Sequence, residues 1–165
     1  MKPTDFEGLF GRLFNGGVDF VLVGGLAATL HGSARATYDL DVVYARASEN
    51  IARLVAALAP IEPYLRAAPR GLPFSFDEQT VKTGLNFTLE TTLGDIDLLG
   101  EVTGGGRYED LLPFVVVVPL FGHQCRCVTL QKLIELKRAA GRPKDREVLA
   151  ELEALLQERE RPADS

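Results

Sequence analysis

The stretch VGGLAATLHGSARATYDLDVVY, residues 23–44, decides the fold. It begins with two glycines, Gly24 and Gly25, that follow an apolar run, and it ends with Asp39 and Asp41 inside a second apolar run. Alternate side chains of a strand point to the same face. The two aspartates therefore share one face of the predicted strand, and the residues beside them face the core.

A second pair of acids, Asp95 and Asp97, follows the same rule in GDIDLLG. Carboxylates this close together repel one another and are costly to desolvate unless a cation neutralises them. Oxygen ligands converging from neighbouring strands suit Mg²⁺. We therefore predict a magnesium site formed by acids of these two pairs, of the kind that often holds two metals. The alternative is that these acids cap strand ends or pair with surface lysines.

The glycines fit the same chemistry. A strand followed by Gly24-Gly25 and a helix leaves main-chain N–H groups free at the helix start, where the helix dipole favours phosphate. Thirteen residues, 26–38, separate this turn from Asp39, enough for a short helix and a return loop. The alternative is that the glycines only form a tight turn.

The hydrophobic pattern around this stretch predicts an α+β domain with a small mixed sheet and a helical tail. We expect one domain over 1–165, with a core at 18–128 and C-terminal helices at 129–160. A proline-rich segment at 60–78 is predicted to be irregular. The other expected elements are helices at 3–16, 25–32 and 48–59, strands at 18–24 and 37–45, a hairpin at 83–102 turning at Leu93-Gly94, a helical turn at 108–113, strands at 114–120 and 123–128, and helices at 129–141 and 142–160.

The composition restricts the class of protein. The chain has 165 residues, of which 46% are hydrophobic and 25% charged, and its net charge of −5 argues against broad, charge-driven binding of nucleic acid. The N-terminal sequence lacks a secretory signal pattern, and no apolar run is long enough to span a membrane. Cys125 and Cys127 are expected to be reduced in one strand. A cytoplasmic location fits best.

The C-terminal part carries a local basic cluster of six cations within 15 residues: Lys132, Lys137, Arg138, Arg142, Lys144 and Arg146. One interpretation is a solvated helical face, and the other is a contact to a triphosphate or to an acceptor RNA. The apolar stripe of the last helix favours core packing over a dimer seam. A homodimer is one alternative for the oligomeric state, which the sequence leaves open. We expect His31 and His123 to be structural.

Three motifs together resemble the nucleotidyltransferase superfamily with the DNA polymerase β-like fold. They are Val23-Gly24-Gly25, Asp39-Leu40-Asp41 and Ile96-Asp97-Leu98. Their spacing, order and hydrophobic context all agree with that family's pattern. The resemblance implies a small mixed sheet with flanking helices and a C-terminal helical pair.

A finer resemblance is to the small bacterial and archaeal branch that includes AbiEii-type toxins and minimal nucleotidyltransferases. The signature Arg-x-Thr-x-Asp-x-Asp is represented by Arg35 and Thr37 before the two aspartates. The C-terminal segment is similar through Lys137 and Asp145, with Arg142 and Lys144 nearby. The resemblance covers about residues 18–156, and the chain lacks the large C-terminal helical domain of a typical toxin of this type.

The resemblance implies transfer of a nucleoside monophosphate from an NTP to an acceptor hydroxyl. Asp39 and Asp41 would hold Mg²⁺, Asp97 would bind a second metal or take the proton, and Gly24 and Gly25 would cradle phosphates. The acceptor would be a tRNA 3′ end, a protein or a small molecule, and one interpretation of the resemblance makes the chain the toxin-like part of a module with an antitoxin partner. The alternatives are a catalytically silent nucleotide-binding or regulatory module, and a protein that binds a partner through its helical tail.

Overall fold

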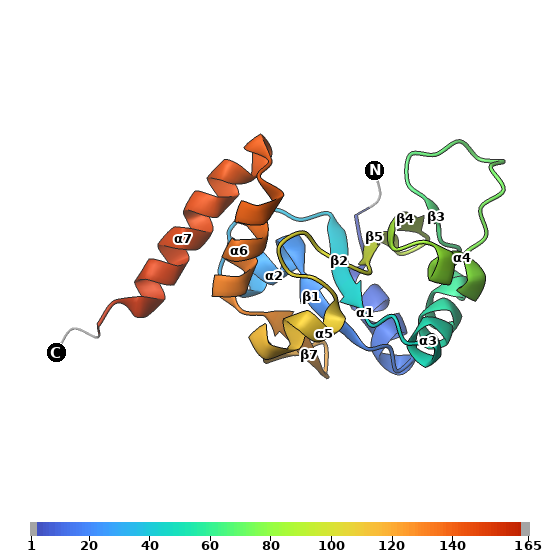
Figure 1. The fold of residues 1–165 in the computed structure, drawn as a ribbon, viewed down its shortest axis with the longest axis horizontal. Helices are drawn as coiled ribbons and strands as arrows, with labels where there is room; N and C mark the ends of the chain where they lie inside the picture. The colour runs from blue at the N-terminus through green and yellow to red at the C-terminus, as the bar shows by residue number, and fades with distance from the viewer. Residues whose placement is uncertain (1–2, 163–165) are drawn as a thin grey trace.

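The computed structural model describes residues 3–162, which form one mixed seven-stranded sheet with helices around it (Figure 1). The strand order is β3-β4-β5-β2-β1-β7-β6. The strands are β1 Phe20–Val23, β2 Asp39–Tyr44, β3 Tyr64–Leu65, β4 Asn86–Thr91, β5 Gly94–Leu99, β6 Val115–Leu120 and β7 His123–Val128. The α+β class predicted from the sequence is confirmed.

The centre of the sheet fixes the position of the acids. β2 lies between β1, to which it is antiparallel, and β5, to which it is parallel. In the β2–β5 register, Asp39 is beside Asp95 and Asp41 is beside Asp97. The intervening side chains, such as Leu40 and Ile96, are fully buried in the core. Burial of these apolar residues fixes the register, because a shift of one residue would turn every acid into the core.

The helices form two groups. α1, α3 and α4 pack together at one end of the molecule, while α6 and α7 pack against each other at the opposite end, near α2 (Figure 1). The helices are α1 Phe6–Asn15, α2 Gly24–Leu30, α3 Ser48–Leu58, α4 Glu78–Thr83, α5 Tyr108–Leu111, α6 Leu130–Ala140 and α7 Arg146–Glu160. None of these helices, within residues 3–162, has the length and apolar character needed to cross a membrane.

The C-terminal helical pair is bounded by local signals. Thr129 caps α6 by accepting a hydrogen bond from the Lys132 N–H at 3.1 Å, and Gly141 ends that helix in the left-handed conformation at φ 63°. The helix predicted to start at residue 142 begins later, at Arg146. A 3₁₀ turn over Pro143–Asp145 comes first.

The segment 60–78 differs from the prediction. It contains the two-residue strand β3, in which Tyr64 and Leu65 pair with Glu90 and Leu89 of β4. The proline that precedes β3, Pro63, is compatible with an edge strand. This pairing joins residues about 25 positions apart in the chain. Local composition therefore does not reveal it.

The two cysteines lie in one strand, as predicted. Cys125 and Cys127 are buried on one face of β7 and are not joined in a disulfide. Burial raises the pKa of their thiols to about 11 and about 12, so both stay protonated at neutral pH. His31 is buried as well, with its Nε2 atom 2.7 Å from the carbonyl oxygen of Val128. This contact joins the end of α2 to the end of β7.

Candidate active site

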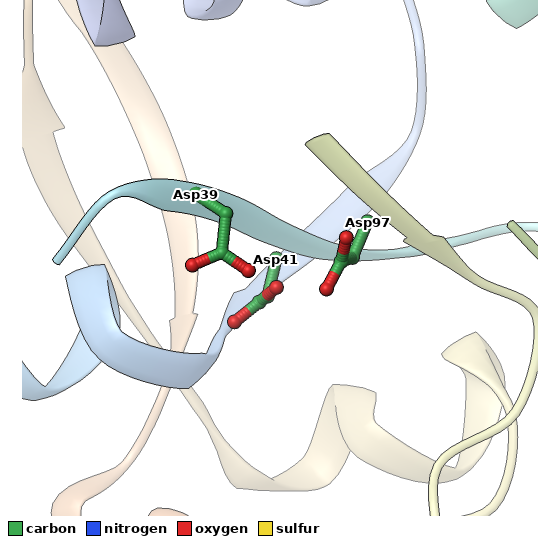
Figure 2. A group of neighbouring side chains, drawn as sticks. All are labelled: Asp39, Asp41 and Asp97. Carbon is green, nitrogen blue, oxygen red and sulfur yellow. The ribbon is translucent and has the colours of Figure 1, made fainter. Parts of the chain in front are cut away.

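Three carboxylates converge on one face of the sheet. Asp39 and Asp41 project from β2 and Asp97 projects from β5, and Figure 2 shows their oxygens facing a common space. One oxygen from each of the three lies within 4.8 Å of the others. All three side chains are only partly buried, so the group is accessible to a small cation.

The electrostatics of this group favour a cation. Burial, together with the neighbouring charge of Asp39 and contacts to Asp97, raises the pKa of Asp41 to about 8. Burial also raises the pKa of Asp97, against the opposing effects of a hydrogen bond with Asp41 and the charge of Arg66. A divalent cation would remove the repulsion that contributes to these shifts. The all-oxygen donor set and its spacing fit Mg²⁺.

Arg66, which follows β3, is a site residue that the sequence did not reveal. Its Nη2 atom donates a hydrogen bond to Asp97 Oδ1 at 2.8 Å. Its Nε lies 3.3 Å from Asp95 Oδ2, and its Nη1 lies 4.0 Å from Asp39 Oδ2. The signal that could have found it is an arginine at the end of a short Tyr-Leu strand. That signal is weak without knowledge of the β3–β4 pairing.

The paired glycines lie directly against the acids. Gly24 is the first residue of α2 and has φ +75°, and a Cβ atom placed on it would lie 2.0 Å from Asp41 Oδ2. A Cβ on Gly25 would lie 2.6 Å from Thr37 Oγ1. Within residues 3–162, no side chain caps the start of α2. The main chain therefore approaches the carboxylates where a helix begins, as the sequence pattern predicted.

A cleft of about 420 Å³ opens beside the carboxylates, between the sheet and α6. This volume is in the range of small-molecule sites. One part of its lining is apolar, and charge comes from three acids, Asp41, Asp97 and Glu101, and from two cations, Lys137 and Arg142. The full lining is Val23, Gly24, Asp41, Asn86, Asp97, Leu99, Glu101, Val102, Thr103, Leu133, Leu136, Lys137, Ala140 and Arg142.

Asp145 holds the two cations of the cleft. Its carboxylate accepts a hydrogen bond from Arg142 Nε at 2.7 Å and lies 3.5 Å from Lys137 Nζ. The residue is 5% exposed. Burial alone would raise the pKa of this carboxyl, but the hydrogen bond from Arg142 and the charge of Lys137 lower it overall. Asp145 thus contacts the cations rather than the cleft itself.

The other predicted residues lie apart from the cleft lining. Arg35 pairs with Glu147 at 3.3 Å and lies 3.9 Å from Glu151, both on α7. The Thr37 hydroxyl lies beside Gly25 and donates a long hydrogen bond, 3.4 Å, to the carbonyl oxygen of Asp39. Lys144 is exposed and is not among the residues that line the cleft.

Comparison with known proteins supports the fold. No family model matches the chain, and no curated protein matches its sequence. A crystal structure from Thermotoga maritima, of a protein presumed to be a nucleotidyltransferase, is similar, with a TM-score of 0.54 and 17% sequence identity. The likeness covers 87% of this chain and 86% of that one. At this identity it shows a shared fold, and the AbiEii-type branch stays a hypothesis.

Asp145→Asn is expected to weaken the binding of an anionic ligand in the cleft about tenfold, while leaving the binding of a divalent cation at the three carboxylates unchanged. The amide removes the negative charge that fixes Lys137 and Arg142, whereas the three clustered carboxylates of Asp39, Asp41 and Asp97 do not contact it. Calorimetric titration of Mg²⁺ and of Mg²⁺ with NTP measures the two effects separately. Equal losses in both titrations would contradict the assignment.

Proposed function

We propose that this protein is a Mg²⁺-dependent nucleotidyltransferase that moves a nucleoside monophosphate from an NTP to an acceptor hydroxyl. The observation that carries the proposal is the convergence of the Asp39, Asp41 and Asp97 carboxylates beside Gly24. The carboxylates lie at the side of a cleft that the cationic side chains of Lys137 and Arg142 also line. The name of the Thermotoga maritima structure agrees with this proposal.

Each part of the site has a role in the proposed reaction. Magnesium held by Asp39, Asp41 and Asp97 would neutralise the charge of the triphosphate and favour ionisation of the attacking hydroxyl. The acceptor oxygen forms a bond to the α-phosphorus, the bond from that phosphorus to the bridging oxygen breaks, and pyrophosphate leaves. The proton of the acceptor hydroxyl passes to a carboxylate of the site, for which Asp97 is the candidate.

The cleft supplies the remaining binding groups. Lys137 and Arg142 offer positive charge for the phosphates, and their position is fixed by Asp145. The apolar side chains of β5 and α6 that line the cleft, such as Leu99 and Leu136, would pack against the nucleoside. Positioning and charge neutralisation would account for most of the rate enhancement.

The test of the proposal begins with binding. We expect at least one of ATP, GTP, CTP and UTP to bind in the presence of Mg²⁺, and the double variant Asp39→Ala/Asp41→Ala to lose that binding. Calorimetric titration measures it. If no NTP binds to the wild-type protein, the alternative of a catalytically silent module on the same fold is favoured.

Asp97→Asn is expected to reduce transfer about a thousandfold, because the amide is neither a base for the proton of the acceptor hydroxyl nor an anionic ligand for the metal. The assay follows the label of α-³²P NTP into RNA, protein and small-molecule fractions, which also identifies the acceptor class. Asp95→Asn is the matched control, because Asp95 lies two residues away on β5 but is not part of the three-oxygen group. A similar loss in both variants would contradict the assigned role of Asp97.

A further inference from the structure

Arg66 contacts the acids that the proposed function assigns to the metal. It donates to Asp97 and lies near Asp39, which are two of the three residues of the oxygen group. It also faces Asp95, which is outside that group. One guanidinium is thus shared among three carboxylates on two strands.

The arginine is anchored from outside the site. Its main-chain N–H donates to the Thr88 carbonyl oxygen at 3.0 Å, which continues the β3–β4 pairing. Its Nη2 atom also donates to the Leu89 carbonyl oxygen at 2.8 Å. The main-chain bond keeps the backbone of Arg66 on the edge of the sheet independently of the carboxylates. The guanidinium can turn away from the acids while this bond stays, although the turn also breaks the Nη2 bond to Leu89.

The contacts of the guanidinium with the acids are not optimal. The Arg66 side chain is 24% exposed, yet its Nε atom is buried and makes no hydrogen bond within residues 3–162, even though Asp95 lies 3.3 Å away. A guanidinium that served only structure would be expected to direct its donors in parallel at one carboxylate. This guanidinium instead takes a compromise position between several negative charges.

A divalent cation and this guanidinium compete for the same charge. A cation bound among the three oxygens would lie beside the carboxylate of Asp97, whose Oδ1 atom Arg66 already contacts at 2.8 Å. Two positive groups this close repel each other in a partly desolvated site. The guanidinium therefore opposes occupancy by the metal, and its withdrawal from Asp97 would favour that occupancy.

We propose that Arg66 is an internal counter-cation that neutralises the carboxylate site until a divalent cation displaces it. The proposal rests on the proposed function, because it takes the three carboxylates as the metal site. Arg66 is a positioning residue in this scheme. It sets the metal concentration at which the site fills, and it keeps the acids together when no metal is bound.

The test is a calorimetric titration of Mn²⁺ alone into wild type and Arg66→Met at pH 8.0. Methionine keeps an unbranched stem and removes the charge. We expect the variant to bind Mn²⁺ about tenfold more tightly, the effect of removing one nearby, partly screened positive charge. Arg66→Lys, which keeps the charge, is expected to bind close to the wild-type affinity.

Arg70→Met is the matched control. Arg70 lies on the same segment, its side chain is 73% exposed, and it pairs with Glu90 at 2.7 Å without contacting the metal-site acids. Its removal is expected to leave Mn²⁺ affinity unchanged. Equal tightening in the Arg70 and Arg66 variants would show a general effect of net charge and would overturn the proposal.

The melting temperature, with and without Mn²⁺, is a second measurement, and it remains informative if the variant is partly destabilised. We expect metal-free Arg66→Met to melt below the wild type, and saturating Mn²⁺ to raise its melting temperature by more than it raises that of the wild type. Weaker or unchanged Mn²⁺ binding in Arg66→Met, with normal binding in the wild type, overturns this proposal and leaves the proposed function intact. An absence of Mn²⁺ binding in both proteins overturns the metal site itself.

Discussion

Asp41→Asn is expected to raise the melting temperature of the metal-free protein by about 5 °C or more at pH 8.5, and to change it little at pH 5. The pKa of Asp41 is raised from 3.8 to about 8, first by burial and then by the charge of Asp39. Between these two values the folded state binds more protons than the unfolded state, so stability falls as the pH rises. Asparagine has no proton to lose and avoids that fall.

The same variant is expected to lose function. Under the proposed function, we expect Mg²⁺ to restore the stability of the wild type at pH 8.5, because it would replace the proton as the group that neutralises Asp41. We expect Mg²⁺ not to stabilise Asp41→Asn, and we expect transfer by this variant to fall about a thousandfold because one ligand of the proposed metal site is lost. Thermal melts at pH 5, 7 and 8.5, with and without Mg²⁺, measure both effects. A wild-type melting temperature that rises with pH relative to that of the variant would contradict the assigned electrostatics.

The acids that oppose stability are also the part of the site that the sequence predicts best. Strands β2 and β5 place Leu40 and Ile96 in the core by strict alternation, so an acid at the next position must lie on the other face. Two acid pairs with this alternation are enough to predict a shared acidic surface. The parallel pairing that sets Asp41 beside Asp97 is long-range, but it follows from burying both apolar faces together.

The remainder of the site depends on contacts that no local pattern encodes. Arg66 enters the site only because β3 pairs with β4, and its hydrogen-bond partner Asp97 is 31 residues away in the chain. The basic cluster is evident in the sequence, but the sequence does not tell which of its cations line the cleft and which form surface ion pairs. Lys137 and Arg142 line the cleft, whereas Arg138 pairs with Glu153 at 2.7 Å. The packing of α6 on α7 decides which cations face inward.

Gly24→Ala is expected to destabilise the protein by about 3 kcal/mol, the combined cost of a left-handed backbone and a steric overlap. Gly24 has φ +75°, and the added Cβ would lie 2.7 Å from Asp41 Cβ as well as 2.0 Å from its Oδ2. The overlap involves Asp41 Cβ, next to the β2 backbone, so rotation of the carboxylate cannot relieve it. The variant should therefore displace β2 from the start of α2.

Two glycine variants serve as controls. A Cβ on Gly11 in α1 would meet nothing within 4 Å among the described residues, so Gly11→Ala is expected to stabilise the protein by about 0.5 to 1 kcal/mol. A Cβ on Gly25 would meet the Thr37 hydroxyl at 2.6 Å. That hydroxyl can rotate, so Gly25→Ala should have an effect between the other two. Urea unfolding curves of the three variants give this order directly.

Gly24→Ala should weaken NTP binding even under conditions in which the variant is fully folded. Displacement of Asp41 would move one of the three oxygens proposed to bind the metal, so Mg²⁺-dependent NTP binding is expected to weaken at least about a hundredfold even where the protein is folded. Titration of NTP well below the melting temperature separates binding from unfolding. If Gly24→Ala unfolds at a lower urea concentration but binds NTP with the wild-type affinity, Gly24 supports only the fold. The close approach of α2 to Asp41 would then have no part in the chemistry.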